Sequence, residues 1–474
     1  MAHRRGESRT RAALFPVMLD ELVASDALVR VIDAWIARLD MTKMGFSKAQ
    51  AQRMGRPPYD PADLLKLYVC GYLNGVRSSR ALERECHRNV EVMWLLGRLV
   101  PDHKTIAEFR RQNSAALVAV SAAFVQFARQ ARLIQGELVA IDGSKIRAVA
   151  SKKALQRKVD LQRTREAITD EINGYLTHLD SADQNENGET AERGAVQAAL
   201  ARLQQRQSEL NEEIARLEDG RSTLSVEGEP EARAMKSLHG APGYNLQTAV
   251  DAHSHLIVHH EVCNDASAIG QLAPMAQGAA QVLQATPAVV TDAGYANSEH
   301  LQALADKGQT AYVAMLERDN NQGAGEYYRL TAFTYDRERD CYVCPANELL
   351  RRKQTMRKEN CVVYAASVAS CANCSLKPQC TGARQRFVRR LAGTDAVEAN
   401  ARRLAAQPEM MQLRRCTVEH PFGTIKHEVL RNARLLMRGL KGARGELSLA
   451  VLAYNLKRLS NWKGTDWALA AVRA

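Results

Sequence analysis

Two short apolar runs end in an aspartate followed by a small residue, and they constrain the fold more than any other feature of the 474-residue chain. The first is ELVAIDGSKI, which contains Asp142, and the second is PAVVTDAGYAN, which contains Asp292. Short apolar runs bounded by turn residues are typical of buried strands. Open α/β sheets place ligands at the carboxyl ends of their strands. We therefore expect both runs to end at one sheet edge, although Asp before a small residue is also common in plain turns.

The positive charge of the chain is concentrated near its C-terminus. The net charge is +12, and residues 381–474 hold 18 Lys and Arg against 7 Asp and Glu. A basic region of this kind is typical of proteins that bind a polyanion, most commonly DNA or RNA. A solubilising basic surface is the alternative.

Residues 1–135 have the pattern of a helical domain. DPADLLKLYVCGYLNGV begins with Asp60 as an N-cap and Pro61 at the first helical position. A second helical stretch, SSRALERECHRNVEVMWLLGRL, follows a glycine turn, so the pair could form a DNA-reading helix-turn-helix, although plain helical hairpins share this pattern. The apolar run 115–128 is too short to cross a bilayer and predicts a buried helix. We expect a cytoplasmic protein, because the N-terminal sequence also lacks the apolar stretch of a signal peptide.

The rest of the sequence divides into a sheet-forming core and two insertions. Residues 153–235 contain two long, charged amphipathic stretches that predict a coiled-coil-like helical hairpin, either a spacer or a dimer contact. Residues 331–390 form a small cysteine-rich insertion. Strand and helix signals alternate in 136–152, 236–330 and 391–474, and GYNLQTAVDAHSHLIVHHEV predicts an antiparallel hairpin there. The predicted fold class is therefore α/β, a mixed α+β core.

A single carboxylate stands among cations in QLRRCTVEHPFGTIKH. Arg415, Glu419 and Lys426 lie at i, i+4 and i+11, within about 40° on one face of a regular helix, and Pro421 predicts a kink near Glu419. Glu419 could be only the partner of Arg415 in a surface pair worth a few tenths of a kcal/mol. Together with the two strand-end aspartates it would instead complete a three-carboxylate site. Such a site can hold two Mg²⁺ ions roughly 3.5–4 Å apart and perform in-line phosphoryl transfer.

These motifs resemble those of the DDE transposases of bacterial insertion sequences, whose catalytic core has the RNase H-like fold. AIDGSKI is similar to the first-Asp strand of that family, and VVTDAGYAN to its second-Asp strand and turn. The stretch around Glu419 resembles the family signature Y-x2-R-x3-E-x6-K, with Arg415 and Lys426 in place and Gln412 where the family has tyrosine. The resemblance runs from about residue 15 to 465.

The resemblance implies an RNase H-like core with an N-terminal helical domain, which is a candidate for binding DNA ends. It implies that Asp142, Asp292 and Glu419 hold two Mg²⁺ or Mn²⁺ ions. Arg415 and Lys426 would bind DNA phosphates near the active site. If the glutamate proved to be only a counter-ion, Glu428 would be the nearest alternative for the third acid.

Five cysteines between Cys341 and Cys380 have the spacing of a zinc ribbon. CYVC and CANC are two C-x2-C pairs separated by 26 residues, and Cys380 lies six residues beyond the second pair. Free buried thiols are the alternative. In similar transposases the second Cys of the first pair usually precedes proline. The resemblance thus implies a structural Zn²⁺ held by Cys344, Cys371, Cys374 and Cys380, with Cys341 as the alternate. The remaining cysteines are expected to be small apolar fillers: Cys70, Cys86, Cys263, Cys361 and Cys416.

The function that this resemblance implies is transposition. The protein would bind the terminal inverted repeats of its own element, cut them in a Mg²⁺-dependent reaction and join the freed 3′-hydroxyls to target DNA. Because two ends must be joined together, we expect a homodimer or larger assembly on double-stranded DNA, with no membrane partner. Two alternatives are an RNase H-like nuclease without strand transfer and a zinc-ribbon DNA-binding regulator with an inactive core.

Overall fold

The computed structural model describes residues 18–50, 57–183, 190–218, 223–315 and 327–473 of the chain. It is a mixed α/β structure, as the sequence predicted. The α-helices are α1 (Leu28–Ala37), α2 (Pro61–Leu73), α3 (Ser79–Arg88), α4 (Val90–Leu95), α5 (His103–Gln112), α6 (Ser114–Gln130), α7 (Lys158–Asp183), α8 (Thr190–Glu218), α9 (Leu272–Leu283), α10 (Ser298–Asp306), α11 (Val368–Ala372), α12 (Thr394–Ala406), α13 (Glu409–Gly423), α14 (Gly439–Lys463) and α15 (Thr465–Arg473). The strands are β1 (Leu138–Arg147), β2 (Leu155–Arg157), β3 (Leu224–Val226), β4 (Arg233–Met235), β5 (Ala241–Asp251), β6 (Ile257–Cys263), β7 (Ala288–Thr291), β8 (Ala311–Val313), β9 (Thr334–Asp336), β10 (Cys341–Val343), β11 (Leu349–Met356), β12 (Cys361–Ala365) and β13 (Phe387–Leu391).

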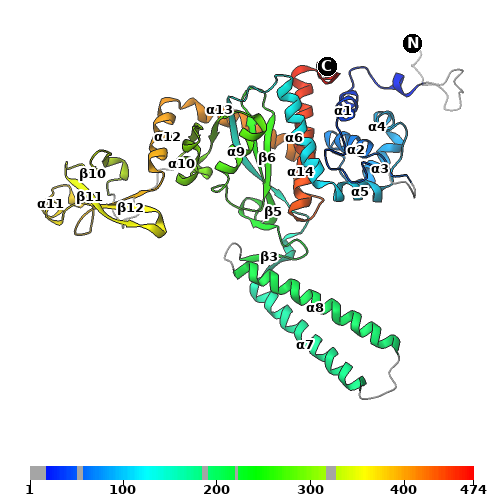
Figure 1. Ribbon diagram of the computed structural model, residues 1–474, viewed down its shortest axis with the longest axis horizontal. Helices are drawn as coiled ribbons and strands as arrows, with labels where there is room; N and C mark the ends of the chain where they lie inside the picture. The colour runs from blue at the N-terminus through cyan, green and yellow to red at the C-terminus, as the bar shows by residue number, and fades with distance from the viewer. Residues whose placement is uncertain (1–17, 51–56, 184–189, 219–222, 316–326, 474) are drawn as a thin grey trace, which may run out of the picture.

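A mixed sheet forms the centre of the molecule (Figure 1). Its strand order is β4-β5-β1-β7-β8, and β6 also pairs with β5. The pairs β1–β5 and β5–β6 are antiparallel, whereas β1–β7 and β7–β8 are parallel. The β5–β6 pair confirms the hairpin predicted from the sequence.

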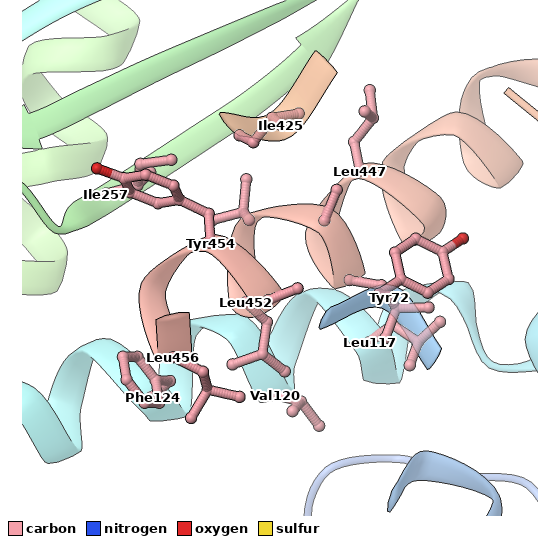
Figure 2. Close-up of a cluster of buried hydrophobic side chains, with 14 of the residues drawn as sticks. Tyr72, Leu117, Val120, Phe124, Ile257, Ile425, Leu447, Leu452, Tyr454 and Leu456 are labelled. Atoms are coloured by element: carbon pink, nitrogen blue, oxygen red, sulfur yellow. The ribbon is translucent and has the colours of Figure 1, made fainter. Parts of the chain in front are cut away.

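Helix α14 connects this sheet to the helices that cover it. Its middle residues are buried, and it lies between α6 and the sheet (Figure 2). In Figure 2, Leu456 of α14 lies next to Phe124 of α6, and Tyr454 of α14 lies next to Ile257 of β6. The Asn455 amide holds β6 in place, because its Oδ1 accepts the Ile257 N–H at 2.9 Å and its Nδ2 donates to the Ile257 carbonyl at 2.9 Å.

The N-terminal helices share the hydrophobic core of the sheet. Buried side chains of α1, α2, α5 and α6 belong to the same cluster as those of β1, β5, β6 and α14. Asp60 caps α2 as predicted, since its carboxylate accepts the Ala62 N–H at 2.8 Å and Pro61 is the first helical residue. The buried helix predicted from residues 115–128 is α6. A DNA-reading role for α2 and α3 stays a prediction.

The two long helices α7 and α8 pack side by side and project from the core (Figure 1). A two-stranded stem joins them to it, with Leu155 of β2 beside Val226 of β3. A small separate cluster of Leu161, Leu210 and Ile214 lies between the helices near the stem. The connection between the two helices, residues 184–189, lies outside the described residues. The hairpin therefore has its own minor core and is joined to the main body through the stem.

The cysteine-bearing segment folds as a five-stranded antiparallel sheet in the order β13-β12-β11-β10-β9. It lies at one end of the molecule, beyond α10 and α12 (Figure 1). It has its own hydrophobic cluster, which includes Tyr342, Leu350, Tyr364 and Val388. Arg390 of β13 ties this sheet to α12 through ion pairs with Asp395 at 2.7 Å and Glu398 at 3.0 Å.

Two predictions about individual residues were wrong. Asp142 does not end its strand, because β1 continues to Arg147 and keeps pairing with β5 as far as Gly243. Cys416 is not a buried filler, because it lies on an exposed side of α13. Cys70, Cys86 and Cys361 are buried as expected, and Cys263 is partly buried. No helix in the described part of the chain is long and apolar enough to span a lipid bilayer.

Candidate active site

Asp142 and Asp292 lie at the same level of two neighbouring parallel strands. β1 pairs with β7 with Ala140 beside Val290. Continuing that register by two residues brings Asp142 level with Asp292. A slip of one residue would turn every buried side chain to the other face of the sheet, so the packing of both strands fixes this register. The structure thus brings together the two aspartates predicted from the sequence.

Arg414 of α13 contacts both aspartates. Its Nη2 atom lies 2.9 Å from Oδ2 of Asp142 and 3.1 Å from Oδ2 of Asp292. The helix is held against the sheet by Val418, which is buried against Ala140 of β1 and Val290 of β7. Arg414 is one helical turn before Val418 and therefore lies on the same sheet-facing side.

Arg414 was not among the site residues expected from the sequence, although the sequence contains a signal for it. Met410, Arg414, Val418 and Phe422 are spaced four residues apart, and the other three are apolar. Positions four apart lie on one face of a helix, so this pattern places an arginine in a stripe that faces the core. A cation in such a stripe needs an acidic partner on the surface it covers.

The carboxylate of Asp142 is held in a mostly buried position. Its side chain is 20% exposed, and its Oδ1 accepts the Gly143 N–H at 2.7 Å. Burial raises the pKa of Asp142 above its ordinary value, and the charge of Arg414 opposes that rise. The site therefore stabilises the charged carboxylate only as long as a cation is close to it.

Asp292 is the more accessible of the two acids. It directly follows β7 and caps the short 3-10 helix Ala293–Tyr295, with its Oδ1 accepting the Gly294 N–H at 2.9 Å. Its side chain is 46% exposed. Capping fixes one carboxylate oxygen and leaves the other, Oδ2, free to meet a cation, which in this structure is Arg414.

Glu419 and Arg415 lie on α13 and are exposed. The structure gives Glu419 no ion pair with Arg415 or any other residue that it describes. The structure therefore does not contain the surface ion pair between Arg415 and Glu419 that was the alternative expectation. Glu428, the alternative third acid, is exposed and forms an ion pair with Lys457 of α14. The structure thus places Glu419 on the same helix as Arg414 without bringing it to the aspartates.

Helix α13 does not continue as a regular α-helix beyond Gly423. A π-helix, Thr424–Val429, follows it directly, and Pro421 lies inside α13. Since a π-helix has i→i+5 bonds, the angle calculated from 3.6 residues per turn does not hold for Lys426. Lys426 is half-buried rather than exposed like Arg415. Burial lowers the pKa of Lys426, and the charge of Asp142 opposes this, so the ammonium group lies within electrostatic range of that acid.

Polar side chains next to β1 connect the segments that carry the two aspartates. Gln247 of β5 is paired with Gly143, and its Oε1 accepts the hydroxyl of Tyr295, which follows Asp292 by three residues. A Cβ atom at position 143 would lie 2.1 Å from Nε2 of Gln247. Glycine at this position therefore permits a close approach that fixes the two acid-bearing segments relative to each other.

Four cysteines of the insertion line one small pocket. They are Cys344, Cys371, Cys374 and Cys380, whereas Cys341 is not among the residues that line it. Burial raises the pKa of Cys380, and the other three thiols add to that rise. Four sulfur donors around one pocket are the donor set that Zn²⁺ prefers.

Many cations of the basic C-terminal region already have partners within the protein. Arg403, Arg434, Arg444 and Arg458 donate to the backbone carbonyls of Ala311, Ala148, Val262 and Ser254. These side chains hold the fold together and are not all available to a polyanion. Part of the positive charge near the C-terminus thus has a structural role, which composition alone does not reveal.

The donor atoms at Asp142 and Asp292 fit a hard divalent cation. Carboxylate oxygens are the ligands that Mg²⁺ and Mn²⁺ prefer. One nitrogen of Arg414 already contacts an oxygen from each acid, so the two carboxylates share one cation position. Across the described ranges, no group of three His, Cys, Asp or Glu side chains is arranged to hold a metal ion. This holds for the cysteine pocket as well as for the two aspartates and Glu419.

Comparison with known protein families gives two matches, both to transposases. The family described as Transposase domain (DUF772) matches residues 17–112, and the family described as Transposase DDE domain matches residues 221–456. The second range contains Asp292, Arg414 and Glu419, whereas Asp142 lies between the two ranges. No curated protein matches the chain. With transposase domains matched at both ends and two acids brought to one cation position, the chain belongs to the insertion-sequence DDE transposase family.

Proposed function

We propose that the protein binds the terminal inverted repeats of an insertion element and catalyses Mg²⁺-dependent cleavage and strand transfer of DNA. The observation that carries this proposal is the pair Asp142 and Asp292, held at one level of β1 and β7 and sharing one cation. Two carboxylates that share a cation position are the beginning of a metal site for phosphoryl transfer.

The core is proposed to have the RNase H-like fold. The antiparallel strands β6, β5 and β1, followed by the parallel strands β7 and β8, support this assignment. So does the position of the two acids, with Asp142 on β1 and Asp292 directly after the adjacent parallel strand β7. The helical hairpin and the cysteine-bearing sheet would then be insertions into that core.

Asp142, Asp292 and Glu419 would hold Mg²⁺ or Mn²⁺, with two ions in the complete site. The bound ions would activate the attacking water or 3′-hydroxyl and stabilise the leaving oxygen. Glu419 needs to move toward the aspartates, and it is free to do so because it is exposed and has no ion pair among the described residues.

Arg415 and Lys426 are proposed to bind DNA phosphates on either side of these acids. Arg415 is exposed on α13, and no described residue forms an ion pair with it. Lys426 lies half-buried near Asp142, where it would meet a phosphate close to the reacting bond. Phosphate contacts fix the position of a duplex without reading its sequence. Recognition of the repeat would therefore come from other surfaces, with α2 and α3 as candidates, and synapsis of two ends would require at least a dimer.

The cysteine-bearing sheet is proposed to hold one structural Zn²⁺ through Cys344, Cys371, Cys374 and Cys380. Their common pocket supports this set over one that contains Cys341. A small sheet with few buried residues would gain stability from such a metal, because it would join the β10–β11 connection, which carries Cys344, to the β12–β13 connection, which carries the other three ligands.

The test of the function compares Glu419→Gln with Glu428→Gln as a matched control. Each variant is mixed with a duplex that carries the inverted repeats flanking the gene. DNA binding is measured by gel shift, and Mg²⁺-dependent strand cleavage by denaturing gel. Glutamine keeps the size of the side chain but removes the charge that a hard cation needs. Glu419→Gln should retain binding and lose cleavage by orders of magnitude, since each 1.4 kcal/mol of lost transition-state stabilisation is about tenfold in rate.

Glu428→Gln should cleave within a few-fold of the wild type, because Glu428 is paired with Lys457. If the two results are exchanged, Glu428 is the third acid. If both variants cleave normally, the three-carboxylate assignment is wrong. A wild-type protein that cleaves but never yields joined products would instead be a nuclease.

A further inference from the structure

We propose that Arg414 occupies the place of the divalent cation between Asp142 and Asp292, so that a metal ion can load only by displacing its guanidinium group. This inference rests on the proposed metal-dependent function and concerns a residue outside the signature positions of Arg415, Glu419 and Lys426. It makes Arg414 a positioning residue for the two acids in the protein without metal.

The geometry places the guanidinium where a bridging cation would lie. A single nitrogen, Nη2, contacts Oδ2 of Asp142 at 2.9 Å and Oδ2 of Asp292 at 3.1 Å. The other oxygen of each carboxylate is occupied by a backbone N–H, from Gly143 and Gly294. The two Oδ2 atoms are thus the ones left for a cation, and Arg414 takes both.

The two cations cannot share this place. Mg²⁺ lies about 2.0–2.1 Å from its oxygen ligands, so an ion that bridged the two Oδ2 atoms would overlap the nitrogen that now lies between them. The charges differ as well. The single charge of Arg414 leaves the two carboxylates with a net charge of −1, whereas a divalent ion neutralises them. A divalent ion is therefore favoured once the arginine has left.

Arg414 is held at the site mainly by the two acids. Its side chain is only 15% exposed, and its buried Nε atom has no hydrogen-bond partner among the described residues. Removing the arginine would leave Asp142, itself 20% exposed, beside a second carboxylate with no neutralising partner. Such a pair attracts a divalent cation more strongly than the arginine-bridged pair does.

Once displaced, the guanidinium needs a new anionic partner. A guanidinium that leaves a partly buried site loses two charge-assisted contacts, and these are strong when desolvated. The proposed reaction brings DNA phosphates to this surface. Metal loading and phosphate contact would then favour each other, because coupling between two binding events is reciprocal.

The experiment is a titration of the full-length protein with Mn²⁺ in the absence of DNA, followed by calorimetry and by the electron spin resonance signal of free Mn²⁺. The variants are Arg414→Gln and, as a matched control on the next position of the same helix, Arg415→Gln. Arg414→Gln should bind Mn²⁺ at least tenfold more tightly than the wild type. Arg415→Gln should bind within about twofold, because its side chain is exposed and contacts neither aspartate. Equal or weaker binding by Arg414→Gln would overturn the proposal.

Two further variants separate this proposal from the proposed function. Adding Asp142→Asn to Arg414→Gln should abolish the gain in affinity, which shows that the ion binds at these acids. Tightening that persists without Asp142 would also overturn the proposal. Arg414→Lys keeps the positive charge but replaces the guanidinium group with a smaller ammonium group. This variant should bind Mn²⁺ more tightly than the wild type but less tightly than Arg414→Gln. It carries the same test if Arg414→Gln does not fold.

Failure of the displacement proposal and failure of the proposed function give different results in these experiments. If the wild type binds Mn²⁺ and cleaves DNA while neither Arg414 variant binds Mn²⁺ more tightly, the displacement proposal fails and the proposed function stands. If neither the wild type nor any variant binds Mn²⁺, with or without DNA, both fail.

Discussion

Arg77, which lies between α2 and α3, forms a buried ion pair with Glu446 of α14. Nη1 of Arg77 lies 2.9 Å from Oε1 of Glu446, and the side chains are 7% and 0% exposed. Arg77 also donates to the carbonyl of Leu430 at 2.7 Å, and Oε2 of Glu446 accepts the N–H groups of Leu436 and Met437. The pair therefore fixes the segment between the π-helix and α14, and with it the end of α13.

Replacing Arg77 with Met should destabilise the protein strongly. The substitution leaves Glu446 buried without its cation, and breaking a buried pair in this way costs about 3–5 kcal/mol. The free energy of unfolding from urea denaturation measures the loss. The double variant Arg77→Met, Glu446→Gln should lose less than the sum of the two single variants, because it no longer buries an unpaired charge. A loss below about 1 kcal/mol for Arg77→Met would show that the pair is not fully desolvated.

His260 should make stability depend on pH in the acidic range. Its Nε2 lies 2.8 Å from the hydroxyl oxygen of Ser448, and burial lowers the pKa of His260 to about 3 from an ordinary value of 6.5, with the nearby His259 adding to the effect. The unfolded chain takes up a proton below about pH 6.5, which the folded protein does not accept. The contribution of His260 is therefore fully present above pH 6.5 and is lost as the pH falls toward 3.

The measurement is urea unfolding of the wild type and His260→Asn at several pH values between 7.5 and 4. Relative to the variant, the wild type should lose up to about 1.4 kcal/mol for each pH unit below 6.5. His87→Asn is the control, because His87 is an exposed histidine of α3. A stability difference between wild type and His260→Asn that stays constant over this range would contradict the prediction.

Zinc should be present at one ion per chain in protein purified without chelator. The double variant Cys344→Ser, Cys371→Ser removes two of the four sulfur atoms around the pocket and should lose the metal, as measured by elemental analysis. Cys416→Ser is the matched control, since Cys416 is exposed on α13 and should leave the zinc content unchanged. Full zinc content in the double variant would exclude this ligand set.

DNA binding should weaken steeply with salt. With about 6 phosphate contacts, the slope of log K against log salt should be near −5. Arg415→Gln removes an exposed cation and should make the slope shallower by about 0.9. Arg403→Gln should leave the slope unchanged and lower the thermal stability, because Arg403 donates to the Ala311 carbonyl within the core. An affinity for DNA that does not change with salt would contradict the expectation that the basic C-terminal region contacts DNA phosphates.

The sequence predicted the parts of the site that depend on local pattern. Asp142 and Asp292 were found because each follows an apolar run, and β1 and β7 are those runs. That β1 continues past Asp142 depends on pairing with β5 a hundred residues later, which local pattern does not encode. The role of Arg414 likewise depends on the β1–β7 register, which brings together two acids that are 150 positions apart.

The helix that carries Glu419 shows a different limit. Its spacing was calculated for a regular α-helix, and this is correct up to Gly423. Beyond it the π-helix changes the direction of Lys426, and no residue type in TIKHEV marks that change. Glu419 itself was predicted from its neighbours and from family resemblance, and its exposure on α13 depends on which face of the helix packs against Val290.

The two-stranded stem formed by β2 and β3 has a consequence for how this protein can vary. Leu155 pairs with Val226 and Arg157 with Leu224, so the chain leaves the core and returns to it at the same point. Everything between can change in length without moving either end, because the cost of closing a loop rises only slowly with its length. A shortened gene in which a tight Asn-Gly turn replaces residues 158–223 should still encode a folded core. The hairpin of α7 and α8 can therefore be replaced by another segment while the acids on the central sheet keep their positions.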